Sequence, residues 1–141
     1  MDAIVVGTDG SPGAEAAVLK VIELARGTSP TVHLVCAYPG KSALERIGLT
    51  AKTDPVDMRG VAADLLARDE RRLSEAGFTV EKYAREGDPA RTIIEVAEET
   101  GADMIVVGAH GNEGDKRFQI GSAATKLSHH APTSLLIVRD S

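Results

Sequence analysis

Residues 4–11 read IVVGTDGS, and residues 105–112 read IVVGAHGN. Each stretch is a short run of β-branched residues that ends in a glycine-containing loop. A run of this kind, without polar alternation, is typical of a strand that is buried on both faces of a parallel sheet. The chain therefore carries the same unit, a buried strand followed by a glycine loop, near its beginning and again in its last third.

The remaining segments alternate between strand-like and helix-like patterns. The predicted strands are residues 3–8, 31–38, 78–84, 103–108 and 133–139. Apolar residues at helical spacing predict helices in the intervals between them, and each interval is long enough for a right-handed crossover. The alternation predicts an α/β fold: a single doubly wound five-stranded parallel sheet, in the strand order 3-2-1-4-5, with helices on both faces.

Two details of the helices are also predicted from spacing. The inner face of the last helix is expected to comprise Ile120, Ala123, Ala124 and Leu127. In the first half of the chain, apolar positions that include Val61 predict the inner face of a helix that begins at Met58 and is ended by Gly77. The aspartates just before and within this helix are interpreted as residues of the helix start and the surface, not as metal ligands. These aspartates are Asp54, Asp57, Asp64 and Asp69.

Composition narrows the class of protein. The 141 residues are 43% apolar and 26% charged, which indicates one globular domain, residues 1–141. A net charge of −5 argues against nucleic-acid and anionic-membrane partners, because both require a basic surface. No apolar run approaches the 18 residues of a membrane span. A single cysteine, Cys36, and a first stretch without the basic region of a signal peptide favour the cytoplasm.

The order of the strands predicts where a ligand would bind. The first and fourth strands are expected side by side in the middle of the sheet, where the direction of winding reverses. Ligands of doubly wound sheets bind outside the carboxyl ends of the strands at this switch point. The carboxyl ends there are GTDGS, residues 7–11, and GAHGN, residues 108–112. The two similar stretches are therefore expected to deliver two loops to one crevice.

The second loop has the features of a phosphate site. Gly108 and Gly111 allow a tight turn and a close approach of the backbone to a ligand. Gly121 and Ser122 stand where the last helix begins, and the amides and positive dipole end of a helix start favour an anion. The hydroxyl of Ser122 adds a further donor.

The pattern Gly108-x2-Gly111-x9-Gly121-Ser122 resembles the glycine signature of the ATP-binding branch of the universal stress protein family. The resemblance extends over the whole chain, through VVGTDGS, ADMIVVGAHG and GSAATKLSHHAPTSLLIVR. It differs from a Walker-type P-loop, since no Gly-x4-Gly-Lys-Ser/Thr is present. The resemblance implies an adenine-nucleotide binding protein whose ligand is ATP, with or without Mg²⁺.

The resemblance also implies a role for individual residues on the nucleoside side. Asp9 matches the family aspartate near the nucleoside. Ala37, at the end of the second strand, matches a position whose backbone meets the adenine. Val107 and Gly108 match positions that line the ribose and the base.

On the phosphate side, the resemblance assigns Gly111, Gly121, Ser122 and Ala123 to phosphate binding. The loop between the last two glycines also carries charges of both signs, namely Glu113, Asp115, Lys116 and Arg117. The two acidic residues would face the phosphates, so Mg²⁺ or the two basic residues would have to balance them. No residue is expected to ligate a resident metal.

Four functions remain open at this stage: a regulatory ATP-binding protein, a cyclic-AMP binder, a slow ATPase, and a dimeric interaction protein whose crevice is empty. The sequence shows no clear general base, because His110 has no carboxylate partner that can be seen in the sequence, and no catalytic residue is assigned. The resemblance implies a homodimer through the apolar last strand, residues 133–139. The long connection at 39–57 is expected to be mobile without ligand, and the sequence leaves open whether it closes over the crevice as a lid.

Overall fold

The computed structural model describes residues 1–40, 46, 48, 55–110 and 120–140. The strands in this part of the chain are β1 (Ala3–Gly7), β2 (Thr31–Tyr38), β3 (Thr79–Glu86), β4 (Met104–Gly108) and β5 (Ser134–Val138). The helices there are α1 (Pro12–Leu24), α3 (Pro55–Glu75), α4 (Pro89–Thr100) and α5 (Ser122–His130).

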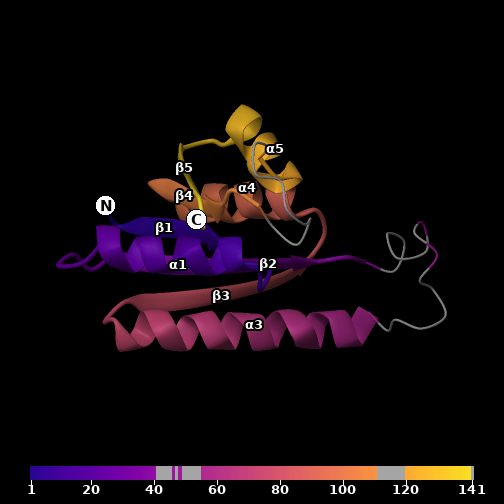
Figure 1. Cartoon of the computed structure of the whole chain (residues 1–141), viewed down its shortest axis with the longest axis horizontal. Helices are drawn as coiled ribbons and strands as arrows, with labels where there is room; N and C mark the ends of the chain where they lie inside the picture. Colours follow the sequence, from indigo (N-terminus) through magenta and orange to yellow (C-terminus); the bar gives the residue numbers. More distant parts are fainter. Residues whose placement is uncertain (41–45, 47, 49–54, 111–119, 141) are drawn as a thin grey trace.

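All five strands pair in parallel, in the order β3-β2-β1-β4-β5, which confirms the predicted doubly wound sheet (Figure 1). The register places Val5 of β1 opposite Ile105 of β4, so the two IVVG stretches lie side by side at the centre of the sheet. Their carboxyl ends therefore reach the same edge of the sheet.

Alternating residues of the central strands face two separate cores. On one face, Ile4 and Val6 of β1 pack with residues of α1 and α3, among them Val18 and Leu66. On the other face, Val5 packs with residues of α4 and α5, such as Val96 and Leu127. Because both faces of β1 and β4 are covered, these strands can consist of apolar residues only.

Two of the described helices, α1 and α4, begin with a side-chain cap. Ser11 is the N-cap of α1, and its side chain accepts a hydrogen bond from the Ala14 amide. Asp88 is the N-cap of α4 and accepts from the Arg91 amide. In each helix a proline follows the cap. An amide hydrogen at this position would have no acceptor within the helix, so proline, which lacks one, costs no hydrogen bond there.

Three expectations about the helices need correction. Ile120 lies before α5 and is 42% exposed, so it is not part of the inner face of that helix. Val61 of α3 is exposed as well. Asp69 of α3 is not a surface residue: it is 1% exposed, because it occupies an inner-face position where Thr8 provides a hydrogen bond.

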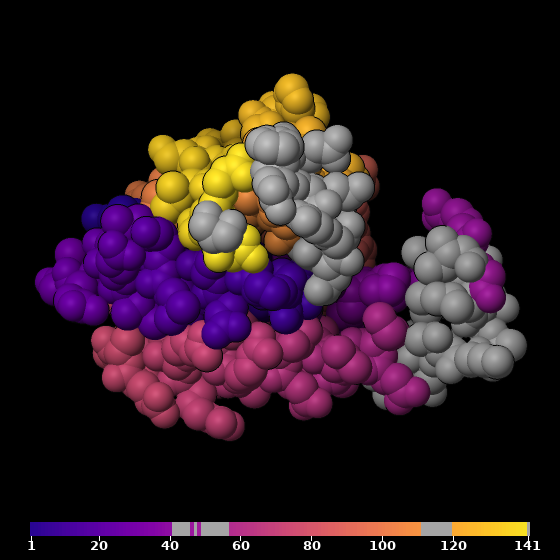
Figure 2. Space-filling model, in the orientation of Figure 1, coloured from indigo at the N-terminus to yellow at the C-terminus, as the bar shows by residue number. Residues whose placement is uncertain are grey.

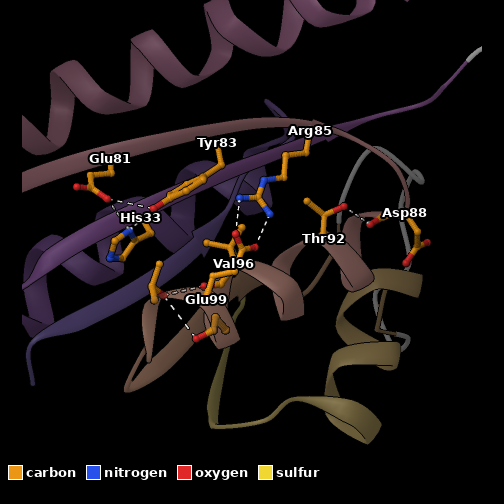
Figure 3. A network of polar contacts seen from close by, with 10 residues as sticks. His33, Glu81, Tyr83, Arg85, Asp88, Thr92, Val96 and Glu99 are labelled. Atoms are coloured by element: carbon orange, nitrogen blue, oxygen red, sulfur yellow. Dashed lines mark hydrogen bonds and ion pairs between the residues drawn. The ribbon is translucent and has the colours of Figure 1, made fainter.

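The two edge strands differ in character. On the face of β3 that points toward α4, polar side chains form a network (Figure 3). The Tyr83 hydroxyl lies 2.8 Å from Nδ1 of His33 and donates to Glu81. Arg85 stacks over the Tyr83 ring and forms a two-fold ion pair with Glu99 of α4. None of these residues lines the cavity described below.

The opposite edge, β5, is apolar. Leu135, Leu136 and Ile137 are each only partly buried, whereas Val138 is fully buried. Figure 2 shows side chains of this strand at the surface between α1 and α5. An apolar edge strand with unpaired backbone groups is suited to pair with a further strand.

Candidate functional site

A cavity of about 360 Å³ opens at the carboxyl end of the sheet, between the loops that follow β1 and β4. The ends of these strands, the start of α4 and the start of α5 form its walls. This is the switch point of the doubly wound sheet, where ligands of such folds bind.

The structure brings the predicted site residues together around this cavity, as far as it describes them. Those that line it are Asp9, Ala37, Val107, Gly108, Gly121, Ser122 and Ala123. Gly111, the remaining predicted residue, lies outside the described residues, as do Glu113, Asp115, Lys116 and Arg117.

Side chains hold the loop after β1. The Asp9 carboxylate accepts a hydrogen bond of 2.9 Å from the Ser11 amide, which closes a tight turn. Thr8 donates its amide to the carbonyl of Val35 and its hydroxyl to Asp69. Asp9 remains exposed and lines the cavity, so it both shapes the loop and faces the ligand space.

Close backbone packing holds the loop after β4. A Cβ at Gly108 would lie 2.5 Å from the carbonyl carbon of Gly13, and a Cβ at Gly13 would lie 2.2 Å from the carbonyl oxygen of His110. The first turn of α1 therefore lies directly on the end of β4. Gly108 is required for this contact, in addition to any approach of a ligand.

Backbone hydrogen bonds continue from this loop to α5. The Ala109 amide donates to the carbonyl of Val138, and the Gly121 amide donates to the carbonyl of Ala109, both at 2.7 Å. Gly121 is the N-cap of α5 with a φ of −62°, and no side chain caps the helix there. Since its own amide is engaged, the amides that could meet an anion are those of the first helical turn, residues 122–124.

The other wall is apolar. It includes Val35 of β2, Val107 of β4 and Ile93 of α4. An apolar surface opposite a few convergent polar groups is the usual arrangement of a small-molecule site. Ile93 was not assigned to the site from the sequence, although its place one turn into a helix that starts beside the switch point was a usable signal.

Further residues were not predicted as part of the site. They are Gly7, Thr8, Ser11, Ala14, Val35, Pro89, Ala109, His110 and Ala124. Most of them are close in sequence to predicted residues of the two loops and of α5, and this closeness could have indicated them. Val35 and Pro89 lie outside the two loops after β1 and β4, so the pattern of these two loops alone could not have indicated them.

Charge near the cavity is sparse in the described part of the chain, where Asp9 and His110 are the ionisable side chains of its lining. Behind the first loop, burial and the carboxylates of Asp9 and Asp69 raise the pKa of Cys36 to about 11. Cys36 is therefore a protonated thiol at neutral pH and not a nucleophile.

An ion pair links the two helices beside the cavity. Lys126 of α5 lies 2.9 Å from Asp88, the N-cap of α4. Partial burial acts to raise the pKa of Asp88, but the hydrogen bonds from Lys126 and the Arg91 amide outweigh it and hold that pKa below its ordinary value. The pair links the start of α4 to the middle of α5.

Within the described residues, no group of three or more His, Cys, Asp or Glu side chains is placed to hold a metal ion. The described helices also include none with the length and apolar character needed to cross a membrane.

Comparison with known proteins agrees with the geometry. A model of the universal stress protein family matches residues 1–139. Stress response protein NhaX of Bacillus subtilis is 28% identical, over 98% of this chain and 98% of its own length. A universal stress protein crystallised in complex with cAMP is 29% identical and covers 99% of this chain and 98% of its own, with a TM-score of 0.74. A universal stress protein from Archaeoglobus fulgidus in complex with dAMP shares the fold, at 24% identity, a TM-score of 0.68 and coverages of 98% and 97%.

Proposed function

The chain belongs to the universal stress protein family, and on that premise we propose that it is a regulatory protein that binds an adenine nucleotide between the loops after β1 and β4. The observation that carries the proposal is the cavity at the switch point. It joins an apolar wall, suited to a base and ribose, to the first turn of α5, suited to a phosphate.

The proposed arrangement assigns each wall to one part of the nucleotide. The base would lie against Ala37 and Val107, with Asp9 near the nucleoside. The phosphates would meet the amides that follow Gly121 and the side chain of Ser122. A structural neighbour that is 29% identical was crystallised with cAMP, which supports an adenine nucleotide as the ligand.

We propose ATP as the ligand, because the spacing of Gly108, Gly111, Gly121 and Ser122 matches the ATP-binding signature. Binding of cAMP is the second candidate, since the neighbour that carries it covers 99% of this chain. Hydrolysis would be slow at most, because the sequence shows no clear general base. We place the protein in the cytoplasm.

Identification of the ligand that copurifies with the protein tests this function. Mass spectrometry of a denatured sample is expected to find an adenine nucleotide. A thermal-shift panel of ATP, ADP, AMP and cAMP, with and without Mg²⁺, should then raise the melting temperature by several degrees at a hundredfold excess over Kd, where binding contributes about 2.7 kcal/mol. If no adenine nucleotide shifts the wild-type protein, the crevice is empty and the protein acts through interactions alone.

We propose further that the protein is a homodimer through β5. Leu135, Leu136 and Ile137 leave part of their surface uncovered on an edge strand, and antiparallel pairing with a second copy would cover it. Ile137→Lys should weaken the dimer, measured by sedimentation at tens of micromolar. A wild-type monomer under these conditions would exclude this assembly.

A further inference from the structure

Asp69 is a buried carboxylate that neither the fold nor the cavity lining by itself requires. It lies on the inner face of α3 and is 1% exposed. Its Oδ2 accepts a hydrogen bond of 2.7 Å from the Thr8 hydroxyl. Its Oδ1 has no hydrogen-bond partner among the described residues, and Nε of Arg68, at 3.5 Å, makes an ion-pair contact only. An apolar residue would fill the same position at lower cost, because burial of a charge is expensive.

The contact is part of a stripe on α3 that holds the loop after β1. Leu65, Asp69 and Arg72 are spaced so that they share one face of the helix. A Cβ at Gly10 would lie 2.7 Å from Leu65, so this side chain already presses on the loop. Arg72 pairs at 2.9 Å with Glu15 in the first turn of α1. The stripe therefore contacts the loop and the helix start on either side of Asp9.

Thr8 lines the cavity, and its hydroxyl is engaged on the α3 side by the hydrogen bond to Asp69. At the preceding residue, Gly7, a Cβ would lie 2.6 Å from Ile93 of α4, so Gly7 faces the α4 side of the sheet. Thr8 alternates to the other side and bonds Asp69 of α3. The hydrogen bond thus anchors the loop from behind, while Asp9, the next residue, lines the cavity as well.

We propose that Asp69 is a positioning residue of the nucleotide site: through Thr8 it fixes the loop that carries Asp9, and so determines nucleotide affinity without touching the nucleotide. This inference rests on the proposed function. It assigns to α3, an element outside the glycine signature, an influence on the site that acts through Thr8.

The test is calorimetric titration with ATP and, separately, with AMP, at a temperature where circular dichroism shows every variant to be folded. Asp69→Ala and Thr8→Val should each weaken binding about tenfold, or about 1.4 kcal/mol. Their combination should weaken it no further, because both remove the same hydrogen bond. Thr8→Ser and Asp69→Asn keep a hydroxyl donor and a carbonyl acceptor, so both should bind within about twofold of the wild type.

Asp64→Asn is the matched control, because Asp64 is an exposed aspartate of the same helix; its affinity should be unchanged. A purely structural role of Asp69 would lower the melting temperature of Asp69→Ala and leave Kd at the wild-type value, which would overturn the proposal. If Asp69→Ala does not fold, Thr8→Val combined with Asp69→Asn replaces it, since no unpaired charge is then buried. A wild type that binds neither nucleotide would overturn the proposed function, and this inference with it; unchanged affinity in the variants of a wild type that binds would overturn this inference alone.

Discussion

The loops after β1 and β4 follow strands of the same sequence, IVVG, but different interactions hold them in place. Side chains fix the first loop: Asp9 bonds the Ser11 amide, and Thr8 bonds Asp69. Backbone groups fix the described parts of the second, where Ala109 bonds Val138 and Gly121 bonds Ala109.

The difference indicates that the two loops have different roles in one cavity. A loop whose side chains are fixed can present one of them, Asp9, in a defined place for a specific contact. The backbone hydrogen bonds of the second loop instead hold Gly121 at the start of α5, where helix amides and the helix dipole favour an anion. The repeated IVVG pattern thus predicts where the two strands lie. The residues after each glycine determine which groups each loop presents to a ligand.

The largest effect on stability is expected where the start of α1 contacts the end of β4. In Gly13→Ala the new Cβ would lie 2.2 Å from the carbonyl oxygen of His110, so α1 must move away from β4. We expect a loss of about 3 kcal/mol in the free energy of unfolding, measured by urea denaturation. Gly60→Ala is the control: no atom lies within 4 Å of its Cβ position in α3, and it should stabilise the protein by about 0.5–1 kcal/mol. Equal unfolding midpoints for Gly13→Ala and the wild type would contradict the close contact.

A smaller effect on stability is expected at α1, the helix that follows the first loop. Ser11→Ala removes the side-chain cap of α1 and should cost about 1 kcal/mol. Ser11→Gly should cost only a few tenths of a kcal/mol, because glycine also suits the backbone of an N-cap. If both variants unfold at the same urea concentration as the wild type, the side-chain bond does not stabilise the first loop as we infer.

The smallest effect is expected beside the second loop. Lys126→Ala breaks the exposed pair with Asp88 and should cost about 0.2–1 kcal/mol at neutral pH. The pKa of Asp88 is lowered in the folded protein, so this stabilisation is present above the ordinary carboxyl pKa of 3.8 and is lost as the pH falls below it. Unfolding experiments at pH 7 and pH 3 should show the difference between variant and wild type shrinking at the lower pH. A constant difference would show that Lys126 acts through packing alone.

Much of the fold could be predicted from local patterns. Apolar runs, proline after a cap and glycine after a strand are signals within a few residues of each other, and they defined the sheet and the switch point. Asp69 could not be predicted as buried, because its partner Thr8 is 61 residues away and helical spacing alone does not show that a polar partner is available. The contact of Gly13 with β4 was missed for the same reason: it depends on the packing of two elements that are distant in the chain.

The sequence predicts a nucleotide site between two loops. The roles of its individual residues stay a proposal. The glycine spacing could indicate the phosphate side because backbone approach requires glycine. The apolar wall at Val35 and Ile93 could not be indicated in this way, because any buried strand or helix carries such residues.

The most direct measurement is calorimetric titration of ATP into the wild type, Gly121→Val and the control Gly60→Val, which changes an exposed glycine of α3 with no atom within 4 Å of its Cβ position. We predict that the wild type and Gly60→Val bind with the same Kd, and that Ser122→Ala binds about tenfold more weakly, within the range for a lost hydrogen bond to a charged group. Gly121→Val should bind at least about a hundredfold more weakly, because its side chain would occupy the approach to the first turn of α5. Equal binding by Gly121→Val and the wild type would contradict a nucleotide site between the two loops.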